Sequence, residues 1–159
     1  MTNSKKAVYF PLFVDLSDKK IVVIGAGKIA CRRIKVLSQF TNQITVVGIS
    51  IHKEVQKLSE EGKIILYEKA YEREDIKGAD IAIIATNDLV LNEEIGKYCK
   101  DLKIMVNIAS DKNKCDFHFP GIVKKEQLVI GVNAGGHDHK KAKAVRQGIE
   151  HFLDREEQS

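Results

Sequence analysis

Short apolar runs recur along the first two-thirds of the chain and alternate with segments of helical periodicity. Most residues in the runs are β-branched, which is typical of strands buried on both faces of a parallel sheet. The runs occupy residues 21–24, 44–47, 64–67, 81–85 and 104–107. Helical spacing of apolar residues follows at 29–40, 50–59 and 92–100, with Ser50 as a candidate N-cap. The alternation predicts an α/β fold with a doubly wound parallel sheet, covered on both faces.

The pattern changes after residue 107. A polar segment at 110–116 precedes two apolar stretches that flank residues 124–127, which predicts a β-hairpin with its turn there. Residues 140–153 then place Ala142, Val145, Ile149 and Phe152 on one helical face. Because one hairpin and one helix bury too little apolar surface to be stable alone, we expect them to pack on the sheet or on a second subunit. We therefore divide the chain into residues 1–112 and 113–159.

A glycine turn, Gly25-Ala26-Gly27, joins the first apolar run to the first helix. Gly25 permits a tight turn, Gly27 lets backbone approach a pyrophosphate, and the helix start offers unpaired N–H groups at the positive end of its dipole. Ala30 occupies the third position of the G-x-G-x-x-G/A pattern, where a small side chain allows close packing of helix on strand. This context favours a Rossmann-type dinucleotide site over an ordinary strand-to-helix turn.

Further candidates follow the other runs, because ligands of open α/β sheets lie at the carboxyl ends of the strands. Thr86 and Asn87 are suited to hydrogen bonding a ribose or a nicotinamide amide; alternatively, Asn87 and Asp88 simply cap the next helix. The second run ends at residues 48–50 without the acidic residue that holds the ribose hydroxyls in NAD sites. Ribose contacts then fall to backbone groups and Ser50. No arginine for a 2′-phosphate is present there, although Lys53 is near, so NAD and NADP both stay open.

Composition limits the class of protein. The chain has 159 residues, 43% of them hydrophobic, and a net charge of +4. It has no apolar run long enough to span a membrane and no signal-peptide core, and three widely spaced cysteines are typical of reduced thiols in a cytoplasmic protein. Because basic and aromatic residues are not interleaved, the charge indicates anionic small molecules rather than nucleic acid. An apolar lead-in at residues 9–16 is expected to be extended and packed on the domain.

Two patterns with histidine raise the question of a metal. Cys115-x-x-His118 and His137-x-His139 lack the spacing of a strong zinc motif, so we expect no metal site in the protein. The basic residues between 140 and 146 form either a solvated helix face or, beside the ligand cleft, a surface that attracts a multiply carboxylated substrate.

Six motifs together resemble the N-terminal family of siroheme synthases, in the order and spacing of that family and from about Tyr9 to Leu153. They are residues 9–13 (YFPLF), 23–30 (VIGAGKIA), 85–88 (ATND), 106–107 (VN), 115–120 (CDFHFP) and 135–136 (GG). Members of this family are precorrin-2 dehydrogenases, some of which double as sirohydrochlorin ferrochelatases. Family chains commonly carry a further helical domain, whereas this chain ends at Ser159.

The resemblance implies both a chemistry and an assembly. With NAD as cofactor, precorrin-2 is oxidised to sirohydrochlorin: a hydride leaves the reduced macrocycle for the nicotinamide, and a base assists the loss of a proton. The Rossmann domain is followed by a hairpin region that builds a homodimer. Carried over by position, the cofactor contacts are Gly25, Ala26, Gly27, Lys28, Ile29, Ile49, Ser50, Thr86 and Asn87.

The chain departs from the family at the residues expected to be catalytic. Members usually have an acid three positions after the asparagine of the fifth strand, where this chain has Ser110 with Asp111 beside it. Serine alone is no general base, so Asp111 is the candidate carboxylate. The family element Gly-Gly-x-Ser-Pro is replaced at 135–139, where His137 or His139 supplies a group that titrates near neutral pH. The alternatives are a module that binds a dinucleotide or a tetrapyrrole without turnover, and a ferrochelatase.

Overall fold

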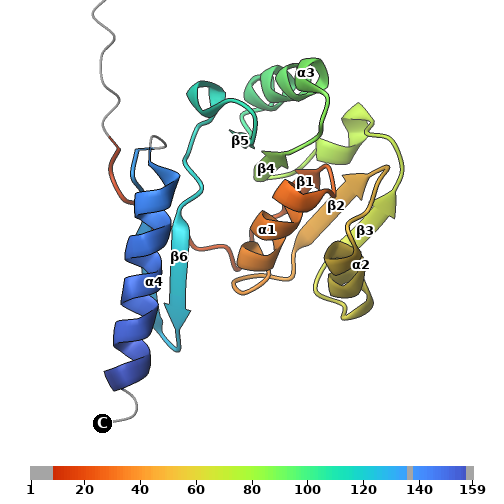
Figure 1. The fold of residues 1–159 in the computed structure, drawn as a ribbon. Helices are drawn as coiled ribbons and strands as arrows, with labels where there is room; N and C mark the ends of the chain where they lie inside the picture. Colours follow the sequence, from red (N-terminus) through yellow and green to blue (C-terminus); the bar gives the residue numbers. More distant parts are fainter. Residues whose placement is uncertain (1–8, 136–137, 157–159) are drawn as a thin grey trace, which may run out of the picture. The chain divides into compact units, whose positions relative to one another are not determined.

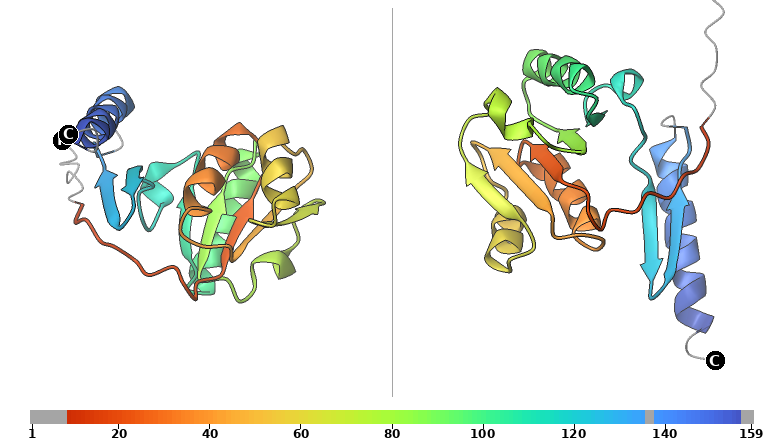
Figure 2. Two further views of the ribbon diagram at one scale, coloured as in Figure 1. Left: turned by 90° about the horizontal axis from the view of Figure 1, so that it is seen from below. Right: turned by 180° about the vertical axis from the view of Figure 1, so that it is seen from behind.

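The computed structural model describes residues 9–135 and 138–156, which form two compact units (Figures 1 and 2). We call residues 15–117 the sheet unit. We call residues 9–14 together with 118–156 the hairpin unit. The chain therefore passes between the two units twice, between Val14 and Asp15 and between Phe117 and His118.

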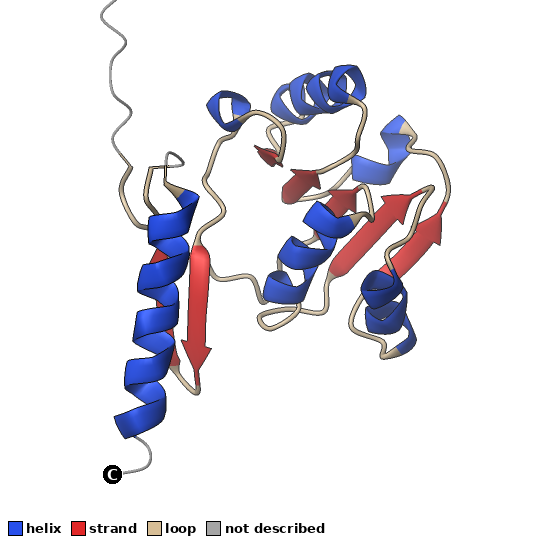
Figure 3. Cartoon of the chain, in the orientation of Figure 1, coloured by secondary structure: helices blue, strands red, loops and turns tan. Residues whose placement is uncertain are grey.

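The sheet unit is a five-stranded parallel sheet with strand order β3-β2-β1-β4-β5, flanked by helices (Figure 3). The strands are β1 (Ile21–Ile24), β2 (Ile44–Gly48), β3 (Ile65–Glu68), β4 (Ile81–Ile84) and β5 (Met105–Ile108). The helices are α1 (Lys28–Leu37), α2 (Lys53–Glu60), α3 (Leu89–Asp101) and the short 3₁₀ segments η1 (Arg73–Ile76) and η2 (Lys112–Lys114). This order confirms the predicted doubly wound α/β fold, in which ligands lie where the order reverses between β1 and β4.

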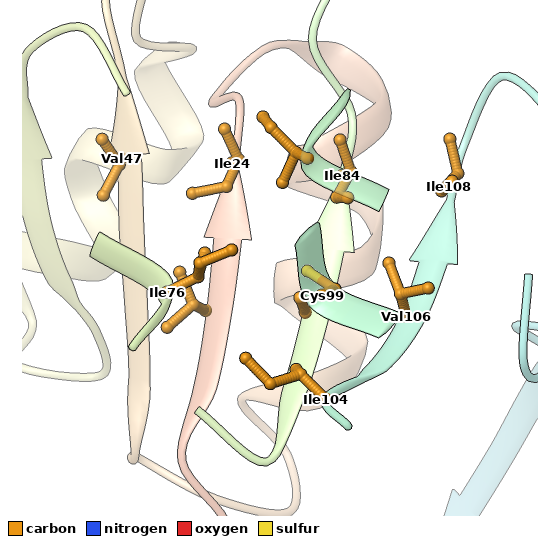
Figure 4. Packing of buried hydrophobic residues seen from close by; sticks show 11 residues of the cluster. Ile24, Val47, Ile76, Ile84, Cys99, Ile104, Val106 and Ile108 are labelled. Carbon is orange, nitrogen blue, oxygen red and sulfur yellow. The ribbon is translucent and has the colours of Figure 1, made fainter. Parts of the chain in front are cut away.

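The core extends over both faces of the sheet because its central strands are apolar at every position. Both β1 and β4 are buried along their whole length, as their unbroken apolar sequences predict. On the face drawn in Figure 4, Ile24, Ile84 and Ile108 from three neighbouring strands pack in one cluster with Ile76 of η1 and Cys99 of α3. The sheet unit thus holds the loops at the ends of its strands on a rigid support.

The starts of two helices differ from the predicted ones. Helix α2 begins at Lys53, and its N-cap is His52, whose ring accepts a hydrogen bond from the Glu54 N–H. Ser50 as N-cap was therefore wrong, because residues 49–52 lie before the helix and His52 caps it. Helix α3 begins three residues earlier than predicted, since the Asp88 carboxylate accepts from the Leu91 N–H and caps it.

The edge strand β5 is covered by the segment that leads out of the sheet unit. The Asp116 N–H donates to the Val106 carbonyl, and the Val106 N–H donates to the Asp116 carboxylate at 2.8 Å. The Cys115 thiol bonds both backbone groups of Ile108 at 3.1 and 3.2 Å, and the Asn107 amide donates to the Phe117 carbonyl at 2.7 Å. These bonds fix the exit of the chain and protect the edge from pairing with another strand.

The hairpin unit contains β6 (Gly121–Lys125), β7 (Leu128–Val132) and α4 (His139–Glu156). The two strands pair antiparallel around a turn at Glu126, which has a φ of 49°, so the predicted hairpin is confirmed. Among the described residues of this unit, Val123 is the one that is buried, and α4 has no buried residue. On α4 the side chains of Val145 and Phe152 remain 45% and 54% exposed.

The apolar lead-in is extended, as predicted, but it is not packed. Phe10, Leu12 and Phe13 are all exposed, so the expectation of a buried lead-in was wrong. The Tyr9 ring lies against His118, with ring centroids 3.9 Å apart. Within the described parts of the chain, no helix is long and apolar enough to cross a membrane.

Candidate functional site

Gly25 opens the loop at the end of β1 in a conformation that only glycine adopts easily. Its φ is +103°, and a Cβ atom there would overlap the carbonyl oxygen of Ala85 and lie 2.7 Å from the carbonyl carbon. The loop from β1 and the end of β4 therefore touch through backbone alone. Gly25 is required by the fold itself, with or without a ligand.

Gly27 differs from Gly25, because no close contact within the described residues requires a glycine at this position. A Cβ atom at Gly27 would meet no atom of the described structure within 4 Å apart from its chain neighbours, and its φ is an ordinary −79°. It is the N-cap of α1 and offers no side-chain cap, so the first N–H groups of the helix stay open to an outside acceptor. The absence of a side chain at Gly27 leaves room for a ligand to approach the backbone at this point.

The surroundings of Gly27 suit a negatively charged group. The first turn of α1 has no acidic residue and includes the exposed Lys28. Ala26 is buried, and its carbonyl accepts from the His52 N–H at 2.9 Å, so this carbonyl points away from the helix start. Ala30 is fully buried at the predicted small-residue position. Open N–H groups, a positive helix end and a lysine together fit the diphosphate of a dinucleotide.

The predicted ribose contacts lie at the carboxyl end of β2. Ile49 and Ser50 follow β2 directly, and both are exposed, as is Ile29 in the first turn of α1. Gly48 holds this end close to the loop, since a Cβ there would lie 3.0 Å from the Ala26 backbone nitrogen. The residues predicted from the second and first strands therefore share one edge of the sheet.

Thr86 and Asn87 follow β4, and the structure distinguishes them. The Thr86 hydroxyl is engaged inside the protein: it donates to the Asn92 side-chain oxygen at 2.5 Å and accepts from the Asp88 N–H at 3.2 Å. Asn87 is exposed. Thr86 thus shapes the loop, Asp88 caps α3 as the simpler alternative predicted, and Asn87 is exposed beside them.

Asn92 is a residue of this site that the sequence pattern did not single out. It was expected to begin the third helix, but it lies in the first turn of α3, is 1% exposed, and bonds both Thr86 and Ser110. A polar residue in the first turn of a helix is ordinary in sequence. Its burial between two loops is visible only in three dimensions.

Ser110 and Asp111 follow β5 at the same edge of the sheet. Ser110 is exposed, and its hydroxyl oxygen accepts from the Asn92 amide at 3.3 Å. The Asp111 carboxylate accepts from the Asn113 N–H at 3.0 Å as the N-cap of η2, and it lies 3.6 Å from the Lys114 ammonium group. Lys114 also pairs with Glu93 at 2.9 Å, which lowers the pKa of the Glu93 carboxyl.

The third predicted catalytic residue, His137, lies outside the described residues. The sulfur of Cys115, a member of one histidine-containing pattern, bonds the backbone of Ile108 and Asp111, and burial raises the pKa of its thiol. In the ranges that the structure describes, no group of three His, Cys, Asp or Glu side chains is arranged to hold a metal ion.

Comparison with known proteins agrees with this geometry. Residues 12–121 match the model of a family of NAD(P)-binding proteins. Over 145 residues the chain is 32% identical to the siroheme synthase of Buchnera aphidicola subsp. Acyrthosiphon pisum and 33% identical to that of Ruthia magnifica subsp. Calyptogena magnifica. Both alignments cover 91% of this chain and 31% of the relative, so the chain spans about a third of the length of these relatives.

A solved structure shows the same fold. The structure of SirC, a precorrin-2 dehydrogenase, matches with a TM-score of 0.81 at 23% sequence identity, over 91% of this chain and 70% of that chain. Together with the siroheme synthases, this match confirms the resemblance found in the sequence motifs.

Proposed function

Because the chain belongs to the NAD(P)-binding family that matches residues 12–121, we propose that it is an NAD-dependent precorrin-2 dehydrogenase, which forms sirohydrochlorin. The observation that carries the proposal is the start of α1, where Gly27 is an N-cap without a side chain, the first turn has no acidic residue, and no described atom lies within 4 Å of the position of a Cβ apart from chain neighbours. The similarity of 91% of the chain to siroheme synthases supports the choice of substrate.

Each part of the glycine loop has a role in holding the cofactor. Gly25 sets the turn, and the backbone of Ala26 and Gly27 approaches the diphosphate, which also receives the open N–H groups of Lys28 and Ile29. Ile49 and Ser50 hold the ribose at the end of β2. Asn87, on the loop that Thr86 shapes, hydrogen-bonds the nicotinamide part of the cofactor. The bound nicotinamide supplies a hydride acceptor for the reduced macrocycle.

Asp111 is the proposed base that takes the accompanying proton from the substrate. Its carboxylate lies on the loop after β5, at the edge of the sheet where the cofactor loops lie, and it is partly exposed. Its bond to the Asn113 N–H holds the carboxylate in one place and leaves its second oxygen on the side of Lys114. His137 is the alternative titrating group.

The hairpin unit is proposed to join two copies of the chain into a cytoplasmic homodimer. The exposed face of α4 around Val145 and Phe152 supports a partner of the same kind, because a single copy leaves this face unburied. The basic cluster of α4, formed by Lys140, Lys141, Lys143 and Arg146, is proposed to attract a multiply carboxylated substrate through its charge. Neither nucleic acid nor a membrane is part of the proposal.

One alternative has an observation in its favour. A module that binds a dinucleotide or a tetrapyrrole without turnover is favoured by Ser110, which replaces the acid usual in the family, and by the Asp111 carboxylate, which already caps η2. Asp111 and Ser110 thus decide between an enzyme and a binding module.

The test is an anaerobic assay with precorrin-2 and NAD, in which NADH and the sirohydrochlorin spectrum are followed together. We expect equal amounts of NADH and sirohydrochlorin, and none without NAD. Binding of both ligands without turnover supports the binding module instead. Ferrous iron is then added to sirohydrochlorin: iron insertion that needs no NAD, in a protein that does not form NADH, indicates a ferrochelatase.

Asp111→Asn tests the proposed base without disturbing its structural role. An asparagine still accepts from the Asn113 N–H and caps η2, but it takes up no proton. We expect kcat to fall by roughly 100-fold, as for the loss of a general base, with melting temperature and NAD affinity unchanged. Full activity in this variant shifts the role to another group, first of all His137.

A further inference from the structure

Asn92 connects the two loops that follow β4 and β5. Its amide nitrogen donates to the Thr86 carbonyl at 3.0 Å and to the Ser110 hydroxyl oxygen at 3.3 Å. Its carbonyl oxygen accepts from the Thr86 N–H at 3.3 Å and from the Thr86 hydroxyl at 2.5 Å. With two donors and two acceptor sites engaged, this buried amide is fully satisfied.

The orientation of the Asn92 amide follows from the Thr86 backbone. A backbone N–H only donates and a carbonyl only accepts, so the oxygen of Asn92 faces the N–H of Thr86 and its nitrogen faces the carbonyl. Exchanging the two atoms would break both bonds. The remaining N–H of Asn92 therefore points to Ser110, and Ser110 receives it on its oxygen.

This arrangement sets the direction of the Ser110 hydroxyl. Because Asn92 supplies the hydrogen in their common bond, the hydrogen of Ser110 points away from Asn92. Ser110 is exposed at the edge of the sheet where the cofactor loops lie. An exposed hydroxyl whose oxygen is already occupied on the inner side is prepared to donate a hydrogen bond outward.

We propose that Asn92 is a positioning residue, which holds Ser110 as a hydrogen-bond donor to a carboxylate of the substrate. The inference rests on the proposed function, since a multiply carboxylated tetrapyrrole supplies the acceptor. An acid at position 110, usual in the family, takes up a proton or repels such a group, whereas the serine binds it. Ser110 thus contributes to substrate affinity, while proton transfer belongs to Asp111.

Asn92→Asp reverses the direction of this bond with almost no change in shape, and it also removes the bond that the Asn92 nitrogen donates to the Thr86 carbonyl. The introduced carboxylate only accepts, so it draws the Ser110 hydrogen inward and removes the outward donor. We expect Asn92→Asp and Ser110→Ala each to raise the KM for precorrin-2 by about tenfold, the effect of one hydrogen bond to a charged group, with a much smaller change in kcat. The double variant should be no worse than Asn92→Asp alone.

A matched control is Asn107→Ser, which removes the other buried asparagine of the sheet unit. In the described structure the Asn107 side chain donates to the Phe117 carbonyl and accepts from the Arg33 guanidinium, and neither bond involves Ser110. The effect of Asn107→Ser on KM should therefore multiply with that of Ser110→Ala. If the effects of Asn92→Asp and Ser110→Ala also multiply, Asn92 acts only through stability and the proposal is overturned.

The two single variants and the double variant at Asn92 and Ser110 are also compared without turnover, by fluorescence titration with sirohydrochlorin in the absence of NAD. Coupling between the two sites in this titration supports the positioning role even if the protein forms no NADH, which contradicts only the dehydrogenase. If Asn92→Asp does not fold, Ser110→Ala still gives a result by nuclear magnetic resonance. One of the two Asn92 amide protons should then shift. If neither proton shifts, the proposed bond is absent.

Discussion

The sheet unit and the hairpin unit differ in how much of their own apolar surface they bury. In the sheet unit, two strands are buried along their whole length, and helices cover both faces. In the described hairpin unit, Val123 is buried, but the 18-residue helix α4 has no buried side chain. The comparison teaches that the sheet unit is a complete support for a ligand site, whereas the hairpin unit does not bury the apolar face of its own helix.

Gly25→Ala is expected to have the largest effect, because it breaks the support itself. The new Cβ atom overlaps the backbone of Ala85, which no side-chain rotation relieves, and the positive φ adds strain. We expect the free energy of unfolding to fall by about 3 kcal/mol or more, as for other strained backbone sites. Urea unfolding measures it. A loss below about 1 kcal/mol would show that the loop after β1 adapts easily to a side chain, which would contradict the claim that the support is rigid.

Gly27→Asp, two residues after Gly25, is expected to weaken ligand binding without lowering stability. A Cβ atom fits there, and aspartate is a good N-cap, so stability should stay equal or rise by about 1 kcal/mol. A carboxylate at the start of α1 occupies the proposed diphosphate position and repels it. We expect NAD affinity to fall by roughly 100-fold, about 2.7 kcal/mol. Titration calorimetry measures the affinity. An unchanged value would show that the cofactor does not bind at this loop.

The pH dependence of stability tests the buried core of the sheet unit. Burial raises the pKa of the Cys99 thiol from 9.0 to about 11, so the folded protein holds this proton while the unfolded chain loses it. The contribution of this pKa shift to the free energy of unfolding is complete below pH 9, and about 2 kcal/mol of it is lost as the pH rises toward 11. We therefore measure the free energy of unfolding from about pH 8 to about pH 11, the range of the pKa shift. This free energy should fall less steeply with pH in Cys99→Ala than in the unchanged protein. Equal slopes would contradict the assignment.

A charge on α4 should separate the copies while leaving the sheet unit intact. Val145→Glu places a carboxylate on the exposed apolar face, where a partner would bury it at a cost. We expect the dimer to dissociate about tenfold more readily, 1.4 kcal/mol, in sedimentation experiments, with NAD affinity unchanged. Gln147→Glu is the control, since it adds the same charge two residues along the helix. Equal effects of the two variants would point to net charge rather than the apolar face.

Much of the sheet unit was predictable because its signals are local. The unbroken apolar runs of β1 and β4 fit no exposed or half-exposed strand, and a glycine turn between strand and helix has few alternatives. The helix starts were harder: Asp88 was offered as a cap, but the exposed apolar residues Leu89 and Val90 do not follow an inward-facing pattern, so the helix was predicted to begin only at Asn92. His52 was equally hidden as the N-cap of α2, because histidine is not a usual cap.

The site was predictable in its loops but not in its network. Each candidate residue of the sheet unit, from Gly25 to Asp111, lies just after a strand, and parallel strands bring their carboxyl ends to one edge, so this part of the list could be made from the sequence. Asn92 comes from inside a helix, and its importance arises from burial between Thr86 and Ser110, which no spacing reveals. The exposed lead-in around Phe10 shows the reverse, since apolar residues alone do not establish that a segment is packed.

The central claim is that NAD lies on the start of α1 in the sheet unit. Titration of the whole ¹⁵N-labelled chain with NAD, followed by nuclear magnetic resonance, tests it most directly. We predict saturable shifts of the backbone amides of Gly27, Lys28 and Ile29. If these three amides stay unmoved at NAD concentrations that saturate other signals, the cofactor binds elsewhere and the account is contradicted.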